Sequence, residues 1–122
     1  MPRAVRALRG ATTVDADTPE QIHERVTTLL KEMWARNDVD HDDLISILFT
    51  VTDDIRSAFP ATAARTIGLG DVPLICAREI PVPGSMPLCI RVLVHFETDK
   101  PRSALHHVYL ENAKSLRDDL PE

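Results

Sequence analysis

The sequence LISILFTV, residues 44–51, is an almost continuous run of apolar and β-branched residues. Such a run is typical of a strand that lies inside a sheet. Upstream, residues 3–9 are followed by Gly-Ala-Thr-Thr, which predicts a strand that ends in a turn. Downstream, residues 72–80 and 88–96 are two further predicted strands. The prolines of the connection at residues 81–87 place it in a loop or at a sheet edge.

Helices are predicted between these strands. Thr18, Pro19 and Gln21 form a helix start, because a hydroxyl caps the first turn, proline suits the first position and glutamine completes a capping box. Apolar residues then recur at helical spacing, namely Ile22, Val26, Leu29, Leu30 and Met33. Residues 57–67 fit a short helix with a proline in its first turn. A last short helical turn is expected from residue 98 onward.

The order strand–helix–strand–helix–strand–strand–helix indicates an α/β or α+β fold with helices on one face of the sheet. Of these two we expect the α+β class with a mixed sheet. The length of 122 residues fits a single domain spanning 1–122. Helices on one face leave the other face of the sheet apolar and exposed. We therefore expect this face to be buried against further copies of the chain in a closed homo-oligomer.

The charge and hydropathy of the chain exclude several classes of protein. A formal net charge of -5 argues against a nucleic-acid-binding surface, which needs clustered cations. No apolar run approaches the ~20 residues of a membrane-spanning helix. The N-terminal stretch is interrupted by arginines and does not resemble a signal peptide. We expect a cytoplasmic protein with no membrane and no nucleic-acid partner.

The cysteines and histidines give no metal site. Cys76 and Cys89 are too few for a disulfide framework, and the five histidines lack metal-ligand spacing. If residues 76–80 and 88–96 form a hairpin, the two thiols could face each other across it. In a reducing cytosol we expect both to be free.

Four segments carry polar side chains suited to a ligand. Arginine, carboxylate, thiol and phenol groups lie at predicted strand or turn ends, in RGATTV (residues 9–14), CAREI (76–80), CIRV (89–92) and HVYLE (107–111). A planar guanidinium binds carboxylates in bidentate fashion. No obvious nucleophile–base pair is present among these groups. The set therefore favours binding a small dianion over attacking it.

These segments resemble the small trimeric chorismate mutases that form a pseudo-α/β-barrel. The resemblance also includes FPATAAR at residues 59–65 and the continuation of the HVYLE segment to residue 117. The five strings stand in that family's order and spacing, and the resemblance runs from about Val5 to Arg117. It implies a homotrimer with active sites at subunit interfaces. It also implies an isomerase that converts chorismate to prephenate by a Claisen rearrangement, in aromatic amino acid biosynthesis, without a cofactor.

The resemblance implies catalytic roles for two residues and substrate-binding roles for others. Arg91, in the family's CIR motif, would place its positive charge at the ether oxygen as the C–O bond breaks. Glu79 would accept a hydrogen bond from the ring hydroxyl; its structural alternative is an ion pair with Arg91 or Arg78. Arg9 would contact a substrate carboxylate, and Tyr109 would donate a hydrogen bond to one.

Four further residues are assigned to substrate binding by the same resemblance. Cys76 would line the pocket without acting as a nucleophile. Phe59 and Arg65 would come from the neighbouring subunit, the first walling the ring and the second steering a carboxylate. Arg117 would close over the ligand.

The chain departs from the family pattern at one position, and two alternative functions are also considered. Thr62 stands where a lysine is common in the family, which should weaken capture of a dianion more than it slows chemistry. A trimeric imine or enamine deaminase of similar architecture is one alternative function. A metabolite-binding module without turnover is the other.

Overall fold

A computed structural model describes residues 2–117 of the chain, apart from the side chain of Arg117. Five strands form one sheet in the order β3-β2-β4-β1-β5. β4 runs antiparallel to its two neighbours, whereas β3 is parallel to β2 and β5 is parallel to β1. The predicted mixed sheet is therefore confirmed. The strands are β1 (Ala4–Thr13), β2 (Leu44–Val51), β3 (Leu74–Arg78), β4 (Cys89–Thr98) and β5 (Val108–Tyr109).

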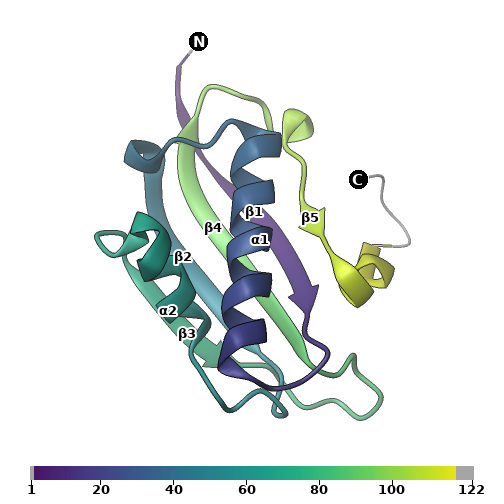
Figure 1. Ribbon diagram of the computed structural model, residues 1–122. Helices are drawn as coiled ribbons and strands as arrows, with labels where there is room; N and C mark the ends of the chain where they lie inside the picture. Colours follow the sequence, from purple (N-terminus) through teal and green to yellow (C-terminus); the bar gives the residue numbers. More distant parts are fainter. Residues whose placement is uncertain (1, 118–122) are drawn as a thin grey trace.

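The helices cover one face of this sheet (Figure 1). α1 crosses the sheet in front of the central strands, and the short α2 lies beside it over β2 and β3. Shorter helical turns connect the strands. The helical elements are α1 (Pro19–Asn37), η1 (His41–Asp43), α2 (Pro60–Ala64), η2 (Arg65–Leu69), η3 (Arg102–Ala104) and η4 (Glu111–Arg117).

The core lies between α1 and the sheet. In the central strands β1, β2 and β4, alternate residues point toward the helix, and fully buried ones among them include Leu8, Phe49 and Phe96. From the helix come the predicted apolar residues, which include Leu29 and Met33. Burying each large side chain of this kind contributes about 1.5–3 kcal/mol. The strands are thus fixed on one face, and their other face remains available for function.

The start of α1 differs from the expected capping box in one respect. The Thr18 hydroxyl accepts a hydrogen bond from the Gln21 backbone N–H at 3.2 Å, as predicted. The Gln21 side chain, however, accepts from the backbone N–H groups of Asp15 and Ala16, at 2.7 and 3.3 Å, and not from Thr18. Gln21 therefore ties the helix to the loop that follows β1.

The prediction that the first strand ends in a turn at Gly10 is wrong, because β1 continues to Thr13. Gly10 faces α1, and a Cβ atom there would lie 2.4 Å from Met33 Sδ and 3.0 Å from Val92 Cγ1. The glycine thus permits a close approach of helix and strand rather than a turn. The β-branched Thr12 and Thr13 then extend the strand.

The conditional hairpin between residues 76–80 and 88–96 does not form. β2 lies between β3 and β4, so Cys76 is opposite Phe49 and Cys89 is opposite Thr13. Both cysteines are free. The two thiols do not face each other.

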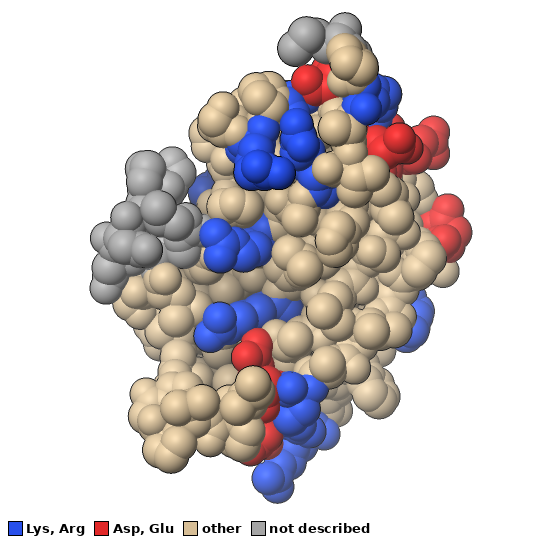
Figure 2. Space-filling view, turned by 180° about the vertical axis from the view of Figure 1, so that it is seen from behind, with Lys and Arg blue, Asp and Glu red and all other residues tan. Residues whose placement is uncertain are grey.

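The back of the sheet, away from the helices, contains a broad apolar surface. Val5 is 55% exposed and Ile75 is 66% exposed. Figure 2 shows this side covered mostly by uncharged residues, with groups of Lys and Arg between them. The expected exposed apolar face is therefore present. Within residues 2–117 there is no helix with the length and hydropathy needed to cross a bilayer.

Candidate active site

Arg91 and Arg9 lie on the back of the sheet on adjacent strands. In β4, Ile90 and Val92 point into the core, so Arg91 between them points to the back. In β1, Arg9 is opposite Leu93, two residues from Arg91 on the same face. Both arginines line a hollow of about 240 Å³, together with Thr50 and Tyr109. The Arg91 side chain is 49% exposed, so a ligand can reach it.

Glu79 is held beside Arg91 by three contacts. It follows β3 directly, and its backbone N–H donates to the Val51 carbonyl at 2.9 Å. Its Oε2 lies 3.4 Å from Arg91 Nε, and the Thr50 hydroxyl donates a hydrogen bond to the same oxygen. The predicted ion pair of Glu79 is therefore with Arg91 rather than with Arg78. A fixed carboxylate next to a fixed guanidinium gives the site a defined electrostatic polarity.

Thr50 was not identified from the sequence. It lies in β2 directly opposite Arg91, on the back of the sheet. Its position inside an apolar run was the only available signal, because a threonine at the second-last position of a predicted strand projects to the opposite face from Phe49 and Val51. Its hydroxyl contacts Glu79, which follows a different strand, β3.

Tyr109 closes one side of the hollow. It lies in β5 opposite Ala11, is 7% exposed and packs against Ala11 and Ala113. These small residues make room for the phenol ring beside the sheet. The structure thus brings together four of the predicted site residues, namely Arg9, Glu79, Arg91 and Tyr109.

Other predicted residues lie around a second hollow, of about 340 Å³, near α2 and β3. Cys76 and Phe59 both line it, and Phe59 is 69% exposed. Arg65 is exposed at the C-terminal end of α2. Within one chain, these residues are not grouped with Arg91. The described part of the chain therefore carries two separate sets of predicted site residues.

The C-terminal segment lies next to Arg91. Asn112, Ser115 and Leu116 of η4 line a wide, open hollow of about 730 Å³, together with Arg91 and Met86. The side chain of Arg117 lies outside the described residues. Its predicted closing role thus concerns a segment that borders the Arg91 site.

The site contains no activated thiol. Cys89 lies two residues before Arg91 and is fully buried, and this burial raises the pKa of its thiol above the ordinary value of 9.0. Nearby Arg91 acts in the opposite direction and does not overcome the effect of burial. Cys89 is therefore a neutral packing residue at pH 7. Among residues 2–117, no group of three or more His, Cys, Asp or Glu side chains could hold a metal ion.

A family model described as chorismate mutase type I matches residues 5–120 of the chain. The chain belongs to this family. Its activity is that of a chorismate mutase, an isomerase of aromatic amino acid biosynthesis that converts chorismate to prephenate. Family membership favours the mutase over the trimeric deaminase alternative.

Two curated relatives and one solved structure place this chorismate mutase among close homologues. It is 52% identical over 117 residues to chorismate mutase AroH of Thermus thermophilus, covering 95% of this chain and 96% of the relative. It is 39% identical to chorismate mutase AroH of Bacillus subtilis, covering 95% and 92%. The structure of a chorismate mutase from Clostridium thermocellum superimposes with a TM-score of 0.89 at 50% identity, covering 90% of this chain and 98% of that one.

Proposed function

We propose that this chorismate mutase carries out its rearrangement in the hollow on the back of the sheet, with Arg91 and Glu79 as catalytic residues. The supporting observation is that the Arg91–Glu79 pair lies beside Arg9 and Tyr109. In the Claisen rearrangement, one C–O bond breaks as a C–C bond forms within the same molecule. The protein therefore needs to hold the reactive conformer and to stabilise charge as it develops.

Arg91 stabilises the ether oxygen as it becomes negative. Its guanidinium is held by Glu79 and remains half exposed, so it is oriented before the substrate arrives. A cation fixed in this way interacts more strongly with the transition state than with the substrate, which raises kcat. Each ~1.4 kcal/mol of such preference increases the rate tenfold.

Glu79 binds the other end of the substrate ring. Its carboxylate accepts a hydrogen bond from the ring hydroxyl and offsets the partial positive charge on the cyclohexadienyl fragment. The contacts from Thr50 and Arg91 hold it in one orientation, which supports a role that needs fixed geometry. Arg9 and Tyr109 contribute to binding, since a guanidinium and a phenol hydroxyl both pair with carboxylates.

We also propose a homotrimer whose active sites combine residues of two subunits. Phe59, Arg65 and Cys76 of one subunit complete the site formed by Arg91 of the next. The exposure of Phe59, at 69%, and the apolar back of the sheet support this arrangement. Thr62 in place of a common lysine leaves one fewer cation at the entrance, and Arg117 closes the site from the C-terminal segment.

A cytoplasmic location is part of the same proposal. The two free thiols, Cys76 and Cys89, are consistent with a reducing compartment.

The proposal is tested by incubating the purified protein with chorismate and following the loss of the conjugated-diene absorbance. We expect turnover by the natural protein and a loss of at least ~10³-fold in kcat for Arg91→Ala. Arg36→Ala is the matched control, since this arginine pairs with Glu32 on α1, away from the site. Near-normal turnover by Arg91→Ala would remove Arg91 from the mechanism.

Two further measurements separate the parts of the proposal. A rigid bicyclic dicarboxylate that mimics the transition state should bind more tightly than chorismate, and binding without turnover would indicate a non-catalytic module. Light scattering should give about three times the chain mass of 13.6 kDa. A monomer that turns over normally would contradict shared active sites.

A further inference from the structure

Tyr109 lies on a strand that the sheet alone holds weakly. β5 contains two residues and pairs with only one neighbour, β1, at the edge of the sheet. The ladder continues through one further hydrogen bond, from Leu110 N–H to the Ala11 carbonyl at 2.9 Å. A strand this short supplies few contacts to fix a side chain. Elements that hold the chain on either side of β5 therefore help to determine where the Tyr109 phenol lies.

Asn37 holds the chain just before β5. It is the last residue of α1 and is 1% exposed. Its Nδ2 donates to the His106 carbonyl at 2.8 Å, and its Oδ1 accepts from the His106 backbone N–H at 2.7 Å. The same amide nitrogen also donates to the Met33 carbonyl at 2.9 Å. This two-point contact fixes both the position and the orientation of the His106 backbone.

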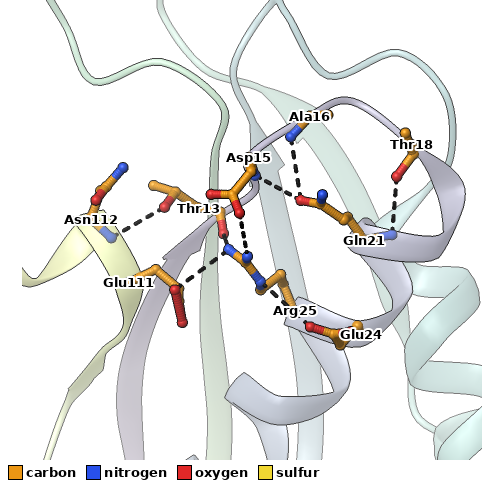
Figure 3. Close-up of polar contacts among 9 residues, drawn as sticks. All are labelled: Thr13, Asp15, Ala16, Thr18, Gln21, Glu24, Arg25, Glu111 and Asn112. Carbon is orange, nitrogen blue, oxygen red and sulfur yellow. Dashed lines mark hydrogen bonds and ion pairs between the residues drawn. The ribbon is translucent and has the colours of Figure 1, made fainter.

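Arg25 holds the chain just after β5 (Figure 3). Its side chain is 14% exposed and donates to the Thr13 carbonyl at the end of β1. One guanidinium nitrogen lies 3.7 Å from Glu111 Oε1, and another lies 3.1 Å from Asp15 Oδ2. The guanidinium therefore joins α1, the end of β1 and the start of η4 at one point.

The Glu111 backbone needs such support. Its φ of 53° lies in the left-handed region, which a residue with a Cβ atom adopts at a cost. Next to it, the Asn112 backbone N–H donates to the Thr13 hydroxyl at 3.2 Å. The turn that leaves β5 is thus held by Arg25 and Thr13 together. If the Arg25 contact is lost, one restraint on this strained turn is lost as well.

We infer that Arg25 and Asn37 are positioning residues for Tyr109: one rigid helix fixes the segment 106–112 at both ends and so sets the place of the phenol in the site. The inference rests on the proposed role of Tyr109 in binding a substrate carboxylate. Neither residue lines the hollow that contains Arg9, Arg91 and Tyr109. Their loss should therefore weaken substrate binding while the electrostatic stabilisation by Arg91 persists.

The first test is a comparison of Arg25→Gln and Glu111→Gln with the natural enzyme, by steady-state kinetics. Both variants should raise KM about five- to tenfold and leave kcat within about twofold, because loosened geometry affects binding at this end of the site. Arg25→Lys should recover part of the loss, since it keeps a cation but not the fork. Arg36→Gln, which removes an exposed pair on the same helix, is the control and should change neither constant.

The second test is a double-mutant cycle with Tyr109→Phe. If Arg25 acts through the phenol, Arg25→Gln should raise KM much less in the Tyr109→Phe background than in the natural one. Thermal unfolding of each variant measures its stability separately. If Arg25 had only a structural role, its substitution would lower this stability without changing the KM of the folded enzyme. An equal KM effect in both backgrounds, or none in either, would overturn the inference. If Tyr109→Phe itself has natural kinetics, the proposed role of Tyr109 fails, and the inference fails with it.

Discussion

Arg91 Nε lies 3.4 Å from Glu79 Oε2, and Arg91 lies in β4 whereas Glu79 directly follows β3, a strand that is not a neighbour of β4 in the sheet. β2 separates them and contributes Thr50, which contacts the same carboxylate oxygen. The charged pair is thus oriented by a neutral residue on the intervening strand. This arrangement provides separate ways to alter the charge at the site and its orientation.

Arg91→Lys should reduce kcat by at least ~10²-fold and raise KM by much less. A lysine keeps the positive charge but loses the planar fork that contacts Glu79 and the substrate oxygen together. Steady-state kinetics with chorismate gives both constants, with Arg36→Lys as the control. A variant with normal kcat and a large increase in KM would show that Arg91 serves binding instead of catalysis.

Thr50→Val should lower kcat about three- to tenfold, because Glu79 loses the hydroxyl that fixes its carboxylate while the shape of the side chain is kept. Thr50→Ser retains the hydroxyl and is the matched control, with kinetics close to those of the natural enzyme. Circular dichroism verifies that both variants fold. The role of Thr50 fails if valine and serine give the same rate.

Gly10→Ala should destabilise the fold by about 1–3 kcal/mol, because the added Cβ would lie 2.4 Å from Met33 Sδ. Urea or thermal unfolding measures this effect. Gly70→Ala is the comparison, since a Cβ there meets nothing within 4 Å and its φ is -65°. Equal stability of the two variants would mean that α1 and β1 do not approach as closely as described.

Asp17→Asn should destabilise the protein near neutral pH and progressively less in acid. The Asp17 carboxylate accepts hydrogen bonds from the Ser57 hydroxyl at 2.8 Å and from the backbone N–H groups of Arg56 and Ser57 at 3.0 and 3.1 Å. The Ser57 hydroxyl is the main cause of the lowered pKa of Asp17.

The sign of the pH effect follows from this lowered pKa. A carboxyl whose pKa is lower in the folded state contributes stability above its ordinary value of 3.8, and the contribution is lost as the pH falls through the folded pKa. The difference between the urea unfolding midpoints of the natural protein and Asp17→Asn should thus be largest near neutral pH and decrease as the pH is lowered below 3.8. A difference that is constant or grows in acid would contradict the assignment.

The sequence was sufficient where local pattern and tertiary environment agree. Residues 44–51 form a strand with the predicted bounds, since a short apolar run rich in β-compatible residues suits a strand within a sheet. Thr18 caps the helix because its hydroxyl accepts a hydrogen bond from the Gln21 backbone N–H in the first turn. Arg9, Glu79, Arg91 and Tyr109 were identified through family-like strings and are brought together in the fold.

The remaining differences are non-local. Gly10 was interpreted as a turn residue, but the reason for a glycine there is Met33 on a helix packed above it. The expected hairpin failed because β2 inserts between β3 and β4, which no pattern in residues 72–96 reveals. Thr50 and Arg25 contact residues distant in sequence, so neither carries a recognisable signal. These features depend on strand order and helix placement.

Successive side chains of β4 point to opposite faces of the sheet, so the register of the strand decides both which residues fill the core and which face the back. Ile90 and Val92 fill the core, and Arg91 between them faces the back of the sheet. Inserting or deleting one residue just before this triplet would turn the Arg91 guanidinium into the apolar core and place an aliphatic side chain on the back of the sheet. A single substitution in this triplet changes either the core or the back of the sheet, whereas a shift of one residue changes both at once.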